Sequence, residues 1–293
     1  MQHYLRYVDS TRGYEPWEVD DGFACRFGET ETGLNYHRVA PGEHMLETLE
    51  RVTGWNVSAT FHELELPIDH FYPRIGRPCM GSDDHLSSPS LQLDRPLVAS
   101  SRSQLIALKR KLEEICLTVQ PEPANLAVFG NEIRNLLILS CTEVEAMWRG
   151  VLGANGSTVK QPTTQHYWQL LKVLRLDEYA VEFPDYPWLA PVRPFAGWDR
   201  DKATASLAWY AAYNGVKHDR EREFARATLE NAFAAVTACA VMAVAQFTIN
   251  GFFGKRGELA AFFRFAQLPR WDVGESYVGI PTPQQSVSHP ALR

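Results

Sequence analysis

Residues 124–153 read ANLAVFGNEIRNLLILSCTEVEAMWRGVLG and carry the longest helical pattern in the chain. With successive side chains about 100° apart, the large apolar ones fall into a single stripe. The stripe consists of Leu126, Phe129, Ile133, Leu136, Leu137, Val144, Met147, Trp148 and Val151. Burial of such a stripe contributes on the order of 1.5–3 kcal/mol for each large side chain. We therefore expect this helix to be a central element of the fold.

Further helical patterns lie on both sides of this segment. They predict helices over residues 101–120, 163–175, 201–218, 224–250 and 255–266. Ser101 or Ser103 is a suitable N-terminal cap for the first of these helices. Residues 178–194 contain four prolines, so we expect a loop there, or at most a β-ribbon that lies on the helices.

Residues 1–100 have a different composition, rich in Gly, Pro, Asp, Ser and aromatic residues. Alternation of apolar and polar residues predicts a strand over residues 59–66, with weaker candidates at 4–8 and 23–27. Residues 76–100 have the composition of a long loop or linker.

These patterns together predict a mainly α fold. A helical bundle spans residues 101–266 in this prediction, and residues 1–100 form a small accessory region of α+β or irregular structure. Residues 267–293 are expected to form a loose C-terminal tail.

The bulk composition is that of an ordinary globular protein. The chain has 293 residues, of which 45% are hydrophobic and 22% charged. Its net charge of −6 argues against a nucleic-acid binder with a basic surface throughout, but it leaves room for a local basic cleft. The five cysteines are scattered and include no C-x-x-C pair, which favours free thiols in a reducing, cytoplasmic compartment.

No membrane segment or signal peptide is expected. Residues 231–249 approach the length of a membrane span, but they are mostly Ala and Val and include Thr237 and Gln246. We therefore expect a buried helix there. Residues 1–6 contain no long apolar run of the kind that a signal peptide requires.

The candidate for a functional site is the stretch Tyr213-Asn214-Gly215-Val216-Lys217-His218-Asp219-Arg220. The preceding residues, 207–213, are apolar on almost every side of a helix, so the helix is expected to be buried. Asn214 and His218 are four residues apart and share one face. Buried polar groups of this kind cost about 1–3 kcal/mol each if they lack partners. Cations at the end of a helix are favourable in any case, which is a purely structural explanation of Lys217 and Arg220.

The predicted pair of long helices resembles the HEPN superfamily. The second helix ends with a polar residue that is followed one turn later by His. The resemblance covers about residues 101–250 and rests on Asn214 and His218. It implies a small helical bundle that acts in prokaryotic toxin–antitoxin or antiviral systems, often as a metal-independent ribonuclease. It also implies a homodimer with RNA bound across the interface, and no metal or cofactor.

The resemblance further implies catalytic roles for Tyr213, Asn214 and His218. His218 would be the general acid or base, and Asn214 would orient it. Tyr213 stands where the family has an arginine, and a tyrosine cannot supply a fixed positive charge. We therefore expect Lys217 and Arg220 to bind the substrate phosphate. A hypothesis from the helical pattern is that Glu143 meets these two cations across the bundle.

Two functions remain open at this point. One is a metal-independent endoribonuclease. The other is a non-catalytic module for dimerisation or for binding a protein partner, in which residues 213–220 are a packed, charge-capped helix end. A metal site is not expected, because the cluster His62, Asp69, His70, Asp83, Asp84 and His85 shows no ligand spacing. Nucleotide-binding loops and serine-hydrolase motifs do not occur in the sequence.

Overall fold

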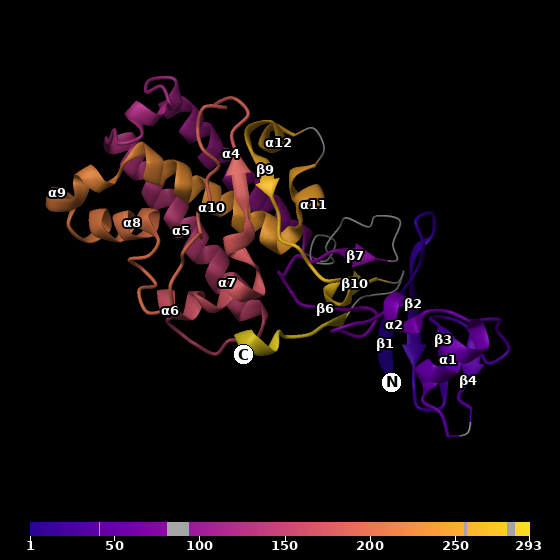
Figure 1. Cartoon of the computed structure of the whole chain (residues 1–293). Coiled ribbons are helices and arrows are strands. Elements are labelled where there is room, and N and C mark those ends of the chain that lie inside the picture. Colours follow the sequence, from indigo (N-terminus) through magenta and orange to yellow (C-terminus); the bar gives the residue numbers. More distant parts are fainter. Residues whose placement is uncertain (41, 81–93, 255–256, 280–284) are drawn as a thin grey trace. The chain divides into compact units, whose positions relative to one another are not determined.

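The computed structural model describes residues 1–40, 42–80, 94–254, 257–279 and 285–293. The chain separates into two compact units, each assembled from stretches that are distant in sequence (Figure 1). The N-terminal unit comprises residues 1–71, 77–89 and 271–287. The helical unit comprises residues 72–76, 90–270 and 288–293.

The N-terminal unit is built on a five-stranded antiparallel sheet with the order β4-β3-β2-β1-β5. Its strands are β1 (Gln2–Asp9), β2 (Gly13–Val19), β3 (Phe23–Arg26), β4 (Tyr36–Arg38) and β5 (Phe61–Glu63). The turn between β1 and β2 places Gly13 at a φ of 67°, in the left-handed region that favours glycine.

Both faces of this sheet are covered. On one face, Tyr4, Trp17 and Phe61 pack with Leu49 of α1 (Met45–Thr53) and Val57 of α2 (Val57–Thr60). On the other face a second apolar cluster contains Leu5, Leu64, Ile68 and Val278. A sheet with two buried faces loses the clean alternation of apolar and polar residues that marks a strand in a sequence.

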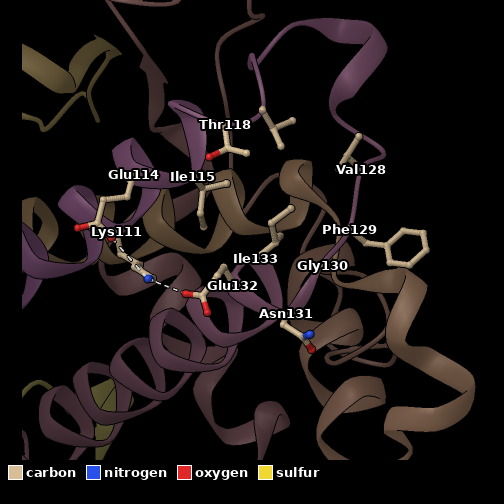
Figure 2. Close-up of a pocket in the computed structure, with 11 residues that line it drawn as sticks. Lys111, Glu114, Ile115, Thr118, Val128, Phe129, Gly130, Asn131, Glu132 and Ile133 are labelled. Atoms are coloured by element: carbon tan, nitrogen blue, oxygen red, sulfur yellow. Dashed lines mark hydrogen bonds and ion pairs between the residues drawn. The ribbon is translucent and has the colours of Figure 1, made fainter.

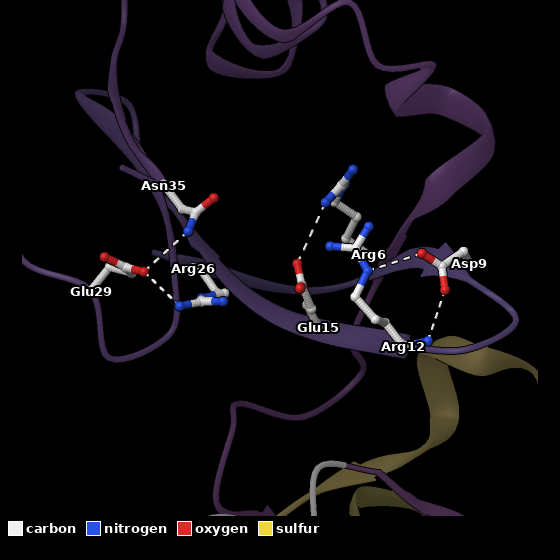
Figure 3. A network of polar contacts seen from close by, with 7 residues as sticks. All are labelled: Arg6, Asp9, Arg12, Glu15, Arg26, Glu29 and Asn35. Carbon is white, nitrogen blue, oxygen red and sulfur yellow. Dashed lines mark hydrogen bonds and ion pairs between the residues drawn. The ribbon is translucent and has the colours of Figure 1, made fainter. Parts of the chain in front are cut away.

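Polar side chains link neighbouring segments of the sheet (Figure 3). Arg6 of β1 pairs with Glu15 of β2 at 3.4 Å, across the hairpin. The Glu29 carboxylate accepts hydrogen bonds from Arg26 at 2.7 Å and from Asn35 at 3.1 Å, which fixes the loop between β3 and β4.

The C-terminal residues of the sequence complete the N-terminal unit. β10 (Tyr277–Val278) pairs with β7 (Cys79–Met80), and β11 (Gln285–Ser286) pairs with β6 (His70–Phe71), both in parallel. The short helix η4 (Val273–Glu275) precedes β10. The expected loose tail therefore contributes regular structure to the N-terminal unit.

Four long helices form the core of the helical unit: α4 (Arg95–Cys116), α5 (Asn131–Ala154), α8 (Ala208–His218) and α10 (Leu229–Phe247). α10 packs against the other three and runs beside α5 (Figure 1). Its small side chains allow close approach, and the Cys239 thiol lies 3.3 Å from the carbonyl oxygen of Ser140 on α5.

Short helical elements lie between these helices or follow α10. They are η1 (Pro123–Asn125), α6 (Thr164–Tyr167), α7 (Gln169–Val173), η2 (Leu176–Glu178), α9 (Arg220–Glu223), η3 (Phe224–Arg226), α11 (Ile249–Phe253), α12 (Glu258–Phe262) and η5 (Pro290–Leu292). Residues 178–194, where we expected a loop or at most a β-ribbon, contain one short strand, β8 (Ala180–Glu182). It pairs antiparallel with β9 (Arg264–Gln267), which begins within the segment that was predicted as a helix over residues 255–266.

Asn155, at the end of α5, joins three stretches of the helical unit and is fully buried. Its amide nitrogen donates to the carbonyl oxygens of Pro73 and Val151, each at 2.9 Å. Its amide oxygen accepts from the backbone nitrogen of His289 at 3.0 Å. The Tyr72 and His289 rings lie 4.5 Å apart between centroids. Asn155 thus binds both residues 72–76 and residues 288–293 to the end of α5.

The prediction of a mainly α fold is wrong. Of the described residues, 47% are helical and 16% lie in strands, and the five-stranded sheet makes this a mixed α/β fold. The error arose in the first 100 residues, where β2 contains Pro16 and where both faces of the sheet are buried. A proline within a candidate strand argues against a central position, yet β2 lies between β1 and β3.

Helix boundaries also differ from the prediction. α4 begins at Arg95, where the Asp94 carboxylate caps the backbone nitrogen of Leu97 at 3.2 Å. α5 begins at Asn131, because Phe129 is in an extended bridge with Thr228. α8 begins at Ala208, after a turn held by the Asp199 carboxylate.

α10 has the length and composition of a membrane span, but 83% of its most apolar window is buried inside the structure. Core helices of soluble proteins share these properties, so the helix is weak evidence for a membrane. The expectation of a buried helix at residues 231–249 is confirmed.

Candidate functional site

The candidate stretch lies where α8 ends and α9 begins. Asp219 ends α8 and caps α9, with its carboxylate accepting from the backbone nitrogen of Arg222 at 3.2 Å. The chain therefore leaves α8 in a defined direction. Glu223 and Arg226 form a 2.6 Å ion pair that covers Gly215, where a methyl group would lie 2.8 Å from the Glu223 carboxylate. The glycine of the motif thus has a packing explanation.

Tyr213 is an interior residue, with 2% of its surface exposed. Its ring centroid lies 5.5 Å from that of Tyr210. Its hydroxyl accepts a hydrogen bond of 3.0 Å from the ammonium of Lys217, which raises the pKa of Lys217. Tyr213 therefore positions Lys217, so that a cation lies beside the tyrosine hydroxyl.

The Asn214 side chain bonds to its own helix. Its amide nitrogen donates to the carbonyl oxygen of Tyr210 at 3.0 Å. The described residues give no hydrogen bond between Asn214 and His218, although the two share a helix face. An orienting role for Asn214 thus lacks a contact, and its polar group is satisfied within α8.

His218 and Arg220 are exposed. Across the described part of the chain, neither side chain has a hydrogen bond or an ion pair to another residue. The bond from His218 to Asp219 or to a carbonyl that a structural role would need is thus missing. Lys217 is also exposed, so three side chains with basic nitrogens are accessible at one helix end.

A polar contact that the sequence did not reveal lies between α8 and α5. The Tyr210 hydroxyl donates to the Glu145 carboxylate of α5 at 2.6 Å. Burial, and then this carboxylate, raise the pKa of Tyr210. Glu145 lies outside the apolar stripe of α5, so only the packing of α8 shows its role.

The carboxylate that faces Lys217 electrostatically is Glu145. Glu143 instead lies near Arg74, and burial raises the pKa of Glu143 despite that cation. The hypothesis that Glu143 meets the Lys217 and Arg220 region has no supporting contact among the described residues.

A pocket of about 330 Å³ lies between the end of α4 and the start of α5 (Figure 2). Its apolar walls include Ile115, Val128 and Phe129. Lys111 and Glu132, which also line the pocket, form an ion pair of 2.6 Å. None of residues 213–220 lines this pocket.

The described residues contain no group of three or more His, Cys, Asp or Glu side chains that could hold a metal ion. Of the cluster considered in the sequence, Asp83, Asp84 and His85 lie outside the described residues. His70 lies near His3, where burial and then His70 lower the pKa of His3.

The α8–α9 junction thus offers an imidazole and two cations to solvent, without a cofactor-binding loop. Comparison of the chain with protein-family models, with curated proteins and with solved structures found no match.

Proposed function

We propose that the helical unit binds RNA at the α8–α9 junction and cleaves it without a metal ion, with His218 as general acid or base. The observation that carries this proposal is the exposure of His218, without a partner among the described residues, beside the accessible cations Lys217 and Arg220. Imidazole groups commonly act as general acids or bases in catalysis.

The chemistry would be attack of the ribose 2′-oxygen on the adjacent phosphorus. The bond from phosphorus to the 5′-oxygen breaks, which leaves a cyclic phosphate and a 5′-hydroxyl. His218 would take the proton from the 2′-hydroxyl or give one to the leaving 5′-oxygen. Lys217 and Arg220 would stabilise the charge that develops on the phosphate. Tyr213 would act as a positioning residue that holds Lys217.

The wider proposal is a cytoplasmic homodimer in a prokaryotic defence or toxin–antitoxin system. The dimer and the biological role rest on the sequence resemblance alone. The five buried, free cysteines support a reducing compartment.

The test is cleavage of a panel of end-labelled structured and single-stranded RNAs in EDTA. His218→Ala is expected to lower the rate about 10²–10⁴-fold. Because His218 has no partner among the described residues, the variant should unfold within about 0.5 kcal/mol of the wild type, which controls for misfolding.

Arg220 has a matched control two residues away. Arg222 is also exposed, but it lies 3.8 Å from the Asp219 carboxylate and so is partly neutralised. Arg220→Ala should raise KM for RNA or lower kcat, whereas Arg222→Ala should have a smaller effect. Equal rates for the wild type and His218→Ala on every RNA would remove the catalytic proposal.

A second function, a non-catalytic interaction module, is favoured by one observation. Tyr213, Asn214 and Lys217 all bond within α8, so part of the motif is used to stabilise the helix. This function predicts no RNA cleavage by the wild type, and the assay above distinguishes the two.

A further inference from the structure

Trp168, directly after α6, has a half-buried indole ring at the surface of the helical unit. Its indole nitrogen donates to the carbonyl oxygen of Trp198 at 3.1 Å, which fixes the ring. The guanidinium carbon of Arg200 lies 5.9 Å from the centroid of the ring. Proteins that bind single-stranded nucleic acids stack bases on aromatic side chains and add contacts from arginine. Trp168 and Arg200 are the two components of such a contact.

The cations near Trp168 are available to a ligand. Arg200 and Lys202 are exposed, and neither forms an ion pair with another described residue. The Asp199 carboxylate accepts from the backbone nitrogens of Asp201 and Lys202 at 2.7 Å and 3.2 Å, so it holds the turn. The helical unit has more Lys and Arg than Asp and Glu, although the net charge of the whole chain is −6. A polyanion is therefore expected to bind the helical unit rather than the N-terminal unit.

A buried aromatic cluster holds this surface in place. Trp148 of α5 is fully buried, and its ring stacks on that of Trp198 with 5.0 Å between centroids. The same ring lies 5.1 Å from that of Tyr167 and 5.4 Å from that of Tyr210. α6, the turn before α8 and α8 itself therefore pack around one side chain. A surface that is ordered before binding loses less conformational entropy when a ligand arrives.

The surface continues along α8 toward the α8–α9 junction. Trp168 follows Thr164 by one helical turn, since its backbone nitrogen donates to the Thr164 carbonyl oxygen at 3.0 Å. The Thr164 hydroxyl in turn interacts with that of Tyr210 on α8. Lys217 follows Tyr210 by seven residues within α8, which is two turns along the same face and about 10 Å. His218 is the next residue, so the candidate catalytic group lies at the end of this path.

We infer that the surface formed by Trp168, Arg200, Lys202 and Lys217 binds single-stranded RNA, with one unpaired base stacked on Trp168. The cations would contact the phosphates on the way to His218. An unpaired base can leave its neighbours and stack on a side chain, whereas the bases of a duplex are already stacked on one another. The choice of RNA as the nucleic acid rests on the proposed function, and binding is tested separately from cleavage.

The first experiment measures binding of the full chain to a fluorescein-labelled 2′-O-methyl oligouridylate by fluorescence anisotropy in EDTA. The 2′-O-methyl group removes the nucleophile of the proposed reaction, so the RNA is bound without being cleaved. The wild type should bind this single strand about tenfold or more tightly than the duplex that it forms with oligoadenylate. Trp168→Leu should weaken binding by about five- to hundredfold, because the stacked base is lost. Arg200→Ala should reduce the slope of log affinity against log salt concentration by about 1.

Trp188→Leu is the matched control. Trp188 is 48% exposed on the same unit, and its indole nitrogen also donates to a carbonyl oxygen, that of Pro121 after α4, at 2.7 Å. This variant should bind the single strand as the wild type does. Equal affinity of Trp168→Leu and Trp188→Leu would overturn the inference, as would equal affinity of the wild type for the strand and the duplex. If Trp168→Leu does not fold, Trp168→Phe and Arg200→Ala decide, and unchanged affinity in both would overturn it.

The outcome is distinguishable from that of the proposed function. His218→Ala should bind the 2′-O-methyl strand as the wild type does while it loses RNA cleavage. If binding depends on Trp168 but the wild type cleaves no RNA, the binding surface stands and the ribonuclease proposal fails. If cleavage depends on His218 but Trp168→Leu binds and cleaves as the wild type does, the reverse holds. A wild type that does not bind the single strand overturns the inference whatever the cleavage assay shows.

Discussion

Replacement of Asn155 by alanine should weaken the helical unit at the point where its separate stretches meet. The substitution removes the two hydrogen bonds of 2.9 Å to Pro73 and Val151 and the bond of 3.0 Å from His289. The Val151 carbonyl oxygen keeps a bond to the backbone nitrogen of residue 155, but Pro73 and His289 lose their partner there.

The expected magnitude follows from these three bonds. Each hydrogen bond contributes about 1 kcal/mol net, and a backbone group left without a partner costs about 1–3 kcal/mol when it is buried. Because Pro73 and His289 are only half-buried, water replaces part of the loss. We therefore expect the free energy of unfolding to fall by about 2–4 kcal/mol.

Urea unfolding followed by circular dichroism measures this change. Asn135→Ala is the control, because Asn135 lies on the exposed face of α5 and should change stability by about 0.5 kcal/mol or less. Carboxypeptidase should also trim residues 288–293 faster in Asn155→Ala. A variant that is as stable as Asn135→Ala, with an equally resistant C-terminus, would refute the role that we assign to Asn155.

Two further predictions concern residues packed against the same helices. Gly76→Ala should lower the free energy of unfolding by about 1–3 kcal/mol. The added methyl group would lie 3.0 Å from the Ala245 carbonyl oxygen and 3.1 Å from the Thr248 backbone nitrogen. A urea unfolding curve that matches that of the wild type would contradict this prediction. Burial raises the pKa of Glu143 above its ordinary value of 4.5, so the folded state binds the proton more tightly than the unfolded state does. At pH values above the raised pKa, the ionised carboxylate therefore lowers the free energy of unfolding. Glu143→Gln should therefore be more stable than the wild type at pH 7, and unfolding at a series of pH values should show this advantage shrink as pH falls toward 4.5. An advantage that stays constant with pH would argue against the assigned cause.

The helical pattern alone identified the central part of the helical unit. The stripe residues from Ile133 to Val151 on α5 are buried, whereas Phe129, which precedes the helix, is 48% exposed. The prediction for α5 itself is confirmed because an amphipathic helix shows its buried face directly in the order of its residues.

The sheet and the site depended on contacts that are distant in sequence. β2 could not be recognised from the sequence, because Pro16 disfavours a central strand. Pairing with β1 and β3, and packing on both faces of the sheet, place it there nevertheless. Likewise, Glu145 lies outside the apolar stripe of α5, and the sequence did not indicate that α8 brings Tyr210 to it. His218 stays a candidate named from the sequence, and its position follows from the end of α8, where Asp219 turns the chain into α9.

The order in which residues leave the ribosome bears on how this protein reaches its folded state. The N-terminal unit needs residues 271–287, and the helical unit needs residues 288–293. Neither unit can therefore be finished during synthesis of the preceding 270 residues, although domains usually fold one after the other as they emerge. Both units therefore depend on the same short segment and are completed almost together.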